Sequence, residues 1–199
     1  MQVQKPAPQF EAMAHVKNNT ESEHKSVKLS DYKGKWVVLF FYPADFTFVC
    51  PTELVAVAKH YDTLKSKNTE VLSISTDTHF THQMWNEVEL SKMIEGGLPY
   101  PMLWDKAGEI GRLYGVYDEE AGMDMRGAFI IDPDGILQSI MVTSPGVGRS
   151  AKELLRQLDA YQYTYENTGK VVPSDWEEGG QTLDPSLKLV GHVCDVMED

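Results

Sequence analysis

The sequence predicts an α/β fold with a mixed β-sheet, because apolar runs typical of strands alternate with segments of helical spacing. The first run, residues 36–42, is continuous and rich in β-branched and aromatic side chains, as in a strand buried on both faces. Residues 128–131 and 136–142 flank a Pro-Asp-Gly turn and predict an antiparallel hairpin. A hairpin added to parallel β-α units gives a central mixed sheet flanked by helices.

The helices of this fold are predicted by periodic apolar residues. Residues 71–76 predict a second strand, and residues 80–93 a helix that ends at a Gly-Gly-Leu-Pro break. Ser150 and Glu153 have the spacing of a capping box and predict the start of a later helix. Helical spacing also follows residue 50, at Leu54, Val57, Ala58, Tyr61 and Leu64.

Composition limits the classes of function. A chain of 199 residues that is 42% hydrophobic can bury a full core as one domain, and no apolar run is long enough for a membrane span. The start of the sequence shows no signal-peptide pattern, so a cytoplasmic protein is expected. A net charge of -12 disfavours nucleic acid and anionic membranes as partners.

We expect a domain over residues 1–170 and an extended C-terminal arm over residues 171–199, which carries Cys194.

Cys50 lies where the first apolar run gives way to a helical pattern, and Cys194 is the only other cysteine. Two cysteines suit a reducing compartment in which a disulfide is transient and catalytic. If Pro51 is the first helical residue, Cys50 is the N-cap; if Thr47 caps the helix, Cys50 is the third helical residue. Both arrangements place the sulfur at the positive end of a helix dipole, which favours the thiolate.

Thiolate formation alone does not make a fast enzyme. Nucleophilicity falls as a thiol becomes more acidic, so the net gain at neutral pH is only a few-fold. We therefore expect fixed dipoles and charges aimed at the transition state to supply the rest.

Pro43, Thr47 and Cys50 form a Pro-x-x-x-Thr-x-x-Cys motif that resembles that of the peroxiredoxins. The longer string around it resembles that of the bacterial alkyl hydroperoxide reductases of the typical two-cysteine peroxiredoxin family. The resemblance covers nearly the whole chain in the family's order, through residues 76–82, 126–132, 146–150 and 185–191.

The resemblance implies a thioredoxin-like fold and a peroxidase that reduces hydrogen peroxide and organic hydroperoxides without a bound cofactor. Cys50 would be the peroxidatic nucleophile and become a sulfenic acid. Thr47 would hydrogen-bond the peroxide, and Pro43 would shield the sulfenic acid from water.

The resemblance also implies roles for charged residues. Arg126 would stabilise the thiolate and the charge on the transferring oxygens, Glu53 would anchor the guanidinium groups, and Arg149 would be a further cation. Alone, each residue would indicate an ordinary cap or surface charge; their joint occurrence, in order, favours the site. His79 and His82 lack a third ligand at suitable spacing, so we expect structural or subunit-contact roles and no metal.

The chain departs from the family at the resolving cysteine, where Val172 stands. Our hypothesis is that Cys194 resolves the sulfenic acid in its place, since condensation with a second thiol gives a disulfide. The alternative is an incidental Cys194 and a reductant that acts on Cys50 directly. Acidic neighbours disfavour the thiolate of Cys194, as suits a resolving thiol: Asp195, Glu198 and Asp199.

Partners follow from the same resemblance. It implies a homodimer through an edge strand at residues 138–142 and a ring of five dimers, with Phe46, Phe48 and Phe80 at the contacts between dimers. A flavoprotein reductase or the thioredoxin system would supply electrons. Residues 96–98 resemble the glycine-rich insert of members prone to overoxidation, and intermediate sensitivity is expected because the companion Tyr-Phe is absent.

Two other functions compete with the peroxidase. An oxidised or assembled form could act as a holdase chaperone or redox-signalling hub, although the sequence contains no dedicated client groove. A thioredoxin-type oxidoreductase would need Cys-x-x-Cys, whereas Cys50 is followed at that spacing by Glu53.

Overall fold

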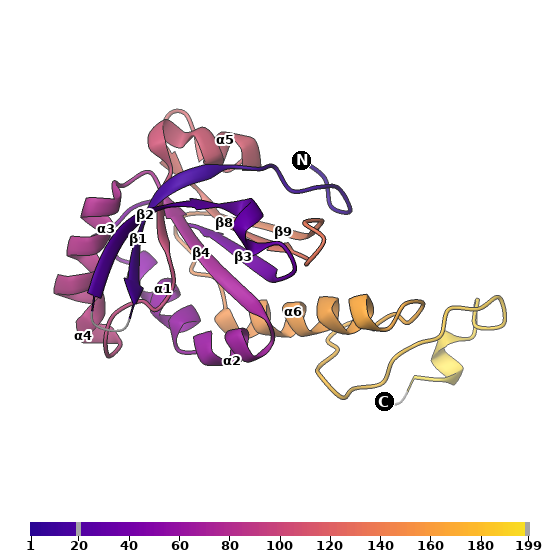
Figure 1. The fold of residues 1–199 in the computed structure, drawn as a ribbon. Coiled ribbons are helices and arrows are strands. Elements are labelled where there is room, and N and C mark those ends of the chain that lie inside the picture. Colours follow the sequence, from indigo (N-terminus) through magenta and orange to yellow (C-terminus); the bar gives the residue numbers. More distant parts are fainter. Residues whose placement is uncertain (19–20, 198–199) are drawn as a thin grey trace. The chain divides into compact units, whose positions relative to one another are not determined.

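The structure is a computed structural model that describes residues 1–18 and 21–197. The chain forms two compact units, Met1–Ala151 and Lys152–Asp199. The first unit contains the large sheet, and the second contains nearly all of helix α6 (Ala151–Glu166) (Figure 1). The division into a domain over residues 1–170 and an arm over residues 171–199 stays a prediction.

Seven strands form the sheet, in the order β2-β1-β5-β4-β3-β8-β9. β3 pairs in parallel with β4 and antiparallel with β8, so the sheet is mixed, as predicted. The predicted hairpin is the antiparallel pair β8 and β9. The strands are β1 (Glu11–Asn18), β2 (Glu21–Lys28), β3 (Trp36–Phe41), β4 (Thr69–Ser75), β5 (Met102–Trp104), β8 (Arg126–Ile131) and β9 (Leu137–Thr143).

Helices lie on both sides of this sheet, and Figure 1 shows α5 on the opposite side from α1 and α2. Beside them the first unit has a short two-stranded ribbon, β6 (Tyr117–Asp118) and β7 (Met123–Asp124). The helices of this unit are the 3-10 turns η1 (Leu29–Tyr32) and η3 (Lys106–Gly108), the π-turn η2 (Asn86–Leu90), and α1 (Cys50–Ala58), α2 (Tyr61–Ser66), α3 (His79–Trp85), α4 (Ser91–Met93) and α5 (Glu109–Tyr114).

Strand β3 lies between β4 and β8 in the sheet, and all six of its residues are buried. Val37, Leu39 and Phe41 join a hydrophobic cluster with Ile110 and Tyr114 of α5. The alternate residues of β3 face the other side of the sheet, since successive side chains of a strand point to opposite faces. The predicted double burial of this strand is confirmed, and it fixes where the loop after β3 emerges.

The strands β1, β2, β5, β6 and β7 were not predicted from the sequence. β2 buries only Val27 and forms one end of the sheet, so it lacks the alternating apolar pattern that marks a half-buried strand. β5 has only three residues. Pairing across the sheet, rather than local propensity, defines β2 and β5.

The helix predicted over residues 80–93 is present but interrupted by the π-turn η2 between α3 and α4. Asn86 begins this turn, and its side-chain oxygen accepts the backbone N–H of Leu98 at 2.7 Å. A Cβ atom at Gly97 would lie 2.4 Å from that oxygen, so the close approach requires glycine. The glycine-rich insert is thereby tied to the helix that precedes it.

The second unit begins with α6, the helix predicted after Ser150, and continues as an extended segment. Val171 and Leu183 form an isolated antiparallel bridge, and the rings of Tyr163 and Trp176 lie 5.2 Å apart. A 3-10 turn, η4 (Val193–Asp195), lies near its end. None of the helices in residues 1–18 and 21–197 combines the length and the apolar character needed to span a bilayer.

Two buried carboxyl groups meet beneath α5 in the first unit. Asp105 accepts the backbone N–H groups of Ile110 and Gly111, each at 2.7 Å. Asp124 is fully buried, and among the described residues no N–H or O–H group of another side chain or backbone donates to its carboxyl oxygens. Burial, together with the charge of Asp105, raises the pKa of Asp124 to about 8, so that Asp124 keeps its proton at neutral pH.

We expect this pair to make stability depend on pH. The folded chain keeps a proton on Asp124 that the unfolded chain releases near pH 4, so stability falls as pH rises from about 4 to about 8. Asp124→Asn replaces the titrating carboxyl group of residue 124 with a neutral amide, whose NH2 group can still donate a hydrogen bond to Asp105. The variant should therefore be more stable than the native protein at alkaline pH, by as much as about 5 kcal/mol, since each of the four pKa units corresponds to about 1.4 kcal/mol.

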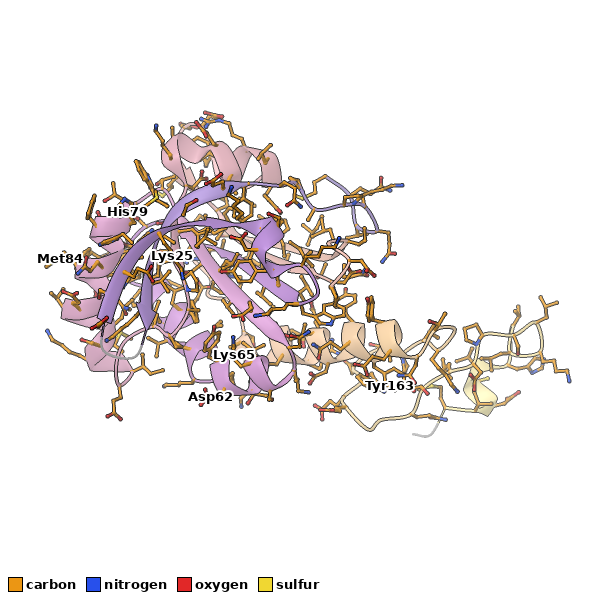
Figure 2. The ribbon with its side chains drawn as sticks, in the orientation of Figure 1. Lys25, Asp62, Lys65, His79, Met84 and Tyr163 are labelled. Atoms are coloured by element: carbon orange, nitrogen blue, oxygen red, sulfur yellow. The ribbon has the colours of Figure 1, made fainter. Side chains whose placement is uncertain are left out.

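Urea unfolding measured across this pH range tests the expectation, with the exposed Asp62→Asn on α2 as the matched control (Figure 2). Parallel pH profiles for native protein and Asp124→Asn would contradict it.

Candidate active site

Cys50 is the first residue of α1 and is fully buried. Neither predicted cap is correct, because the residue that caps α1 is Val49, whose φ of -86° and ψ of -38° are already helical. Thr47 does not cap the helix, since its hydroxyl donates to the carbonyl oxygen of Ala44 at 2.8 Å. Pro51 takes the second helical position, where its missing N–H costs little. The sulfur still lies in the first turn, as both alternatives required.

Arg126 brings a positive charge to this sulfur. It is the first residue of β8 and only 4% exposed, and its Nη1 lies 3.4 Å from the Sγ atom of Cys50. The same Nη1 donates to Oε2 of Glu53 at 2.6 Å, while Nε donates to the carbonyl oxygen of Pro145 at 2.7 Å. Bonds to two elements therefore hold the guanidinium group against the thiol.

Arg149 supplies a second buried guanidinium group. Its Nε and its backbone N–H donate to Oε1 of Glu53 at 2.8 and 2.6 Å, and Nη1 donates to the carbonyl oxygen of Gly127 at 2.7 Å. The group also lies 3.5 Å above the ring of Phe40. Burial lowers the pKa of Arg149, and the ion pair with Glu53 opposes that shift. The guanidinium nevertheless stays charged at any physiological pH.

The loop that carries Arg149 packs tightly on α1. A Cβ atom at Gly148 would lie 3.2 Å from Cγ1 of Val49 and 3.5 Å from Cγ of Glu53. The side chain of Val49 would have to give by a few tenths of an ångström to admit that atom, so glycine suits the close approach that brings the backbone N–H of Arg149 to Glu53.

The charges of this cluster do not balance while the thiol is protonated. Glu53 contributes one negative charge and is 2% exposed, whereas Arg126 and Arg149 contribute two positive charges. A buried charge without a partner is costly, and a thiolate at Cys50 would bring the sum to zero. The arrangement thus presents fixed positive charge and hydrogen-bond donors to any negative charge that develops at the sulfur or beside it.

The loop before α1 holds the remaining motif residues. The hydroxyl proton of Thr47 is directed to Ala44, so the lone pairs of its oxygen stay available to accept a hydrogen bond. Pro43 is buried. Phe46 has a φ of +53°, a strained conformation for a bulky residue, which costs about 1–3 kcal/mol and persists only where the surroundings enforce it.

Cys194 lies in the second unit and is exposed. Its Sγ atom is 3.6 Å from Oδ1 of Asp195, whose Oδ2 atom lies 2.9 Å from Nδ1 of His192. Neither Cys50 nor Cys194 forms a disulfide in this structure. The predicted acidic neighbours Glu198 and Asp199 lie outside the described residues.

The structure also shows contacts that the sequence analysis did not identify. The carbonyl groups of Gly127 and Pro145 and the ring of Phe40 orient the two guanidinium groups, and no local motif announces them. His82 is fully buried and bonded to Asp45. Within residues 1–18 and 21–197, no three side chains of His, Cys, Asp or Glu are arranged to hold a metal ion.

Comparison with known proteins assigns the family. The model of the AhpC/TSA family matches residues 3–140. The chain belongs to this family. It is 53% identical over 192 residues to the selenocysteine-containing peroxiredoxin PrxU of Peptoclostridium acidaminophilum, covering 96% of this chain and 93% of the relative. It is 47% identical over 186 residues to alkyl hydroperoxide reductase C of Bacillus subtilis, covering 92% and 95%.

Solved structures agree with this assignment. The reduced 2-Cys peroxiredoxin of Plasmodium vivax superposes with a TM-score of 0.86 at 36% identity, covering 94% of each chain. The AhpC of Enterococcus faecalis gives a TM-score of 0.78 at 40% identity, covering 86% of this chain and 98% of the other. The predicted thioredoxin-like fold is confirmed. The chain is a peroxiredoxin, a thiol-dependent peroxidase that reduces hydroperoxides with electrons from a reductant.

We expect the Glu53 carboxylate to be essential to the folded site. Glu53→Gln keeps the shape of the side chain but removes the carboxylate that pairs with both buried guanidinium groups. Removal of one partner of such a pair should lower the free energy of unfolding by about 3 kcal/mol.

Urea unfolding of Glu53→Gln and of Glu119→Gln provides the comparison. Glu119 pairs with Arg112 on the surface, where an ion pair contributes little, so its variant should unfold close to the native protein. Equal, small effects in the two variants would contradict the account of the buried cluster.

Proposed function

We propose that Cys50 is the nucleophile of the peroxidase reaction. Its thiolate attacks the terminal oxygen of a hydroperoxide, the O–O bond breaks, and the leaving alkoxide or hydroxide takes up a proton. The products are a Cys50 sulfenic acid and an alcohol or water. The 3.4 Å contact between its sulfur and Nη1 of Arg126 is the observation that carries this assignment.

The neighbouring residues divide the work of stabilising this step. Arg126 faces the sulfur and stabilises the negative charge that moves onto the peroxide oxygens. Thr47 accepts a hydrogen bond from the peroxide hydroxyl, since its own proton is held by Ala44. Glu53 holds Arg126 and Arg149 in position, and Pro43 limits the access of water to the sulfenic acid.

We assign the resolving step to Cys194. Its thiol condenses with the Cys50 sulfenic acid, a disulfide forms, and the hydroxyl group leaves as water. The disulfide is then reduced by an external dithiol, from a flavoprotein reductase or the thioredoxin system. Two features support this step: Val172 occupies the position of the usual resolving cysteine, and Cys194 is exposed, as an attacking thiol must be. Substrates are hydrogen peroxide and organic hydroperoxides, in the cytoplasm.

Assembly is part of the proposal. β9 is an end strand of the sheet with exposed Ile140 and Val142, which suits pairing with a second copy of the chain. Large apolar side chains are exposed around the loop before α1 and along α3, where Met84 points outward (Figure 2). They suit contacts between dimers in a ring of five: Phe46 at 52% exposed, Phe48 at 94% and Phe80 at 62%.

Disulfide mapping after one equivalent of peroxide tests the two cysteine roles. We expect a Cys50–Cys194 bond in the native protein, found by mass spectrometry without reduction. Cys194→Ser should react with peroxide at the native rate and then accumulate sulfenic acid, so that turnover with a disulfide reductant is lost.

Cys50→Ser is the matched control and should consume no peroxide. Native turnover by Cys194→Ser would end the resolving role while leaving that of Cys50 intact, and peroxide consumption by Cys50→Ser would overturn both.

A further inference from the structure

A buried hydrogen-bonded network lies directly behind the peroxide-binding loop. Its members are Tyr42, at the end of β3, Asp45, in the loop, and His82, on α3, and each is buried. The hydroxyl of Tyr42 donates to Oδ1 of Asp45 at 2.8 Å, and Nδ1 of His82 lies 2.7 Å from Oδ2. None of the three is among the residues to which the peroxidase reaction assigns a chemical step.

The partners of His82 fix where its protons lie. Nε2 is 3.1 Å from the carbonyl oxygen of Leu103, which can only accept, so Nε2 carries a proton. Nδ1 faces a carboxylate oxygen, so a proton also lies between Nδ1 and Asp45. His82 therefore links β5 to the loop through one hydrogen bond from each nitrogen of its ring.

Asp45 is held through its backbone as well. Its N–H donates to Oδ2 of Asp77 at 2.8 Å, and the same oxygen accepts the hydroxyl of Ser75 at 2.8 Å. The next residue is Phe46, whose backbone has the strained positive φ and whose ring lies 6.1 Å from that of Trp85. A strained residue stays in place only where its neighbours enforce the geometry, and Asp45, the residue before it, is held by hydrogen bonds to both its backbone and its side chain.

The residue on the other side of Asp45 is Ala44, whose carbonyl oxygen accepts the hydroxyl of Thr47. A shift of Asp45 would move this carbonyl and turn the lone pairs of the Thr47 oxygen away from the peroxide. We propose that His82, through Asp45, is a positioning residue that sets the orientation of Thr47 for peroxide binding. This inference rests on the role proposed for Thr47.

Two substitutions distinguish the contribution of the His82 hydrogen bond to Asp45 from that of its hydrogen bond to Leu103. His82→Asn places an amide near the position of Nδ1 and keeps a donor to Asp45, whereas His82→Gln reaches towards Leu103 and loses Asp45. We expect His82→Gln to slow the oxidation of Cys50 by hydrogen peroxide about tenfold, since small displacements of a catalytic geometry are costly. His82→Asn should retain most of the native rate.

A second readout separates positioning from general damage. Alkylation of Cys50 by iodoacetamide requires the thiolate but not Thr47, so its rate should be unchanged in both variants. His60→Gln, a substitution at a histidine outside the site, serves as the control for both rates. Equal slowing of alkylation and peroxide oxidation in His82→Gln would overturn the inference.

A double-mutant cycle tests whether His82 acts through Thr47. Thr47→Val should slow peroxide oxidation, and adding His82→Gln to it should cost little more. The inference about His82 would be overturned if the losses of the two substitutions were additive, or if His82→Gln kept the native rate while Thr47→Val was slow. Either result would leave the role proposed for Thr47 intact. A native rate in Thr47→Val would instead remove the role proposed for Thr47. If His82→Gln does not fold, Tyr42→Phe, which removes one bond to Asp45, takes its place in the cycle with the same expectations.

Discussion

One buried carboxylate organises the catalytic end of this molecule. Glu53 accepts hydrogen bonds from Arg126 and Arg149, and it lies one helical turn from Cys50 on the same helix. The position of α1 therefore determines both the sulfur and the anchor for the cations. β8 and the loop after β9 then supply the two arginines. Without the carboxylate, the two guanidinium groups would repel each other at close range in a buried site.

Burial of these charges costs stability, so a structural role alone does not explain the cluster. Well-packed apolar side chains often stabilise a core as well as buried ions do, so a charged cluster is weak support for a purely structural role. Here Glu53, Arg126 and Arg149 together carry one positive charge in excess, and Arg126 contacts the sulfur. Such fixed charges act on a transition state without reorganisation, and in the proposed mechanism they supply the rate that thiolate formation alone does not.

Local patterns in the sequence were sufficient for the strands β3 and β4, for the hairpin of β8 and β9, and for the start of the helix at Cys50, although the helical spacing that continues to Leu64 divides into α1 and α2. They were insufficient where distant pairing decides the structure, as in the polar end strand β2 and the short β5. The capping predictions were wrong because the hydroxyl of Thr47 bonds to Ala44, a choice that the sequence pattern does not distinguish. Nor did any local pattern indicate that His82 would reach Asp45 or that Asp105 would meet Asp124, since each pair is joined only by the fold.

Arg126 faces the sulfur of Cys50 and, in the proposed mechanism, stabilises the negative charge that develops as the sulfur attacks a peroxide. The most direct test is the rate at which hydrogen peroxide oxidises Cys50 in a single turnover, measured in a Cys194→Ser background so that a single sulfur reacts. Arg126→Met is compared there with Arg112→Met, a substitution of an exposed arginine. Arg126→Met should be slowed about a hundredfold or more, as expected for the loss of one fixed donor to a transition state, whereas Arg112→Met should react at the rate of the parent protein. Equal oxidation rates in all three proteins would contradict this role of Arg126.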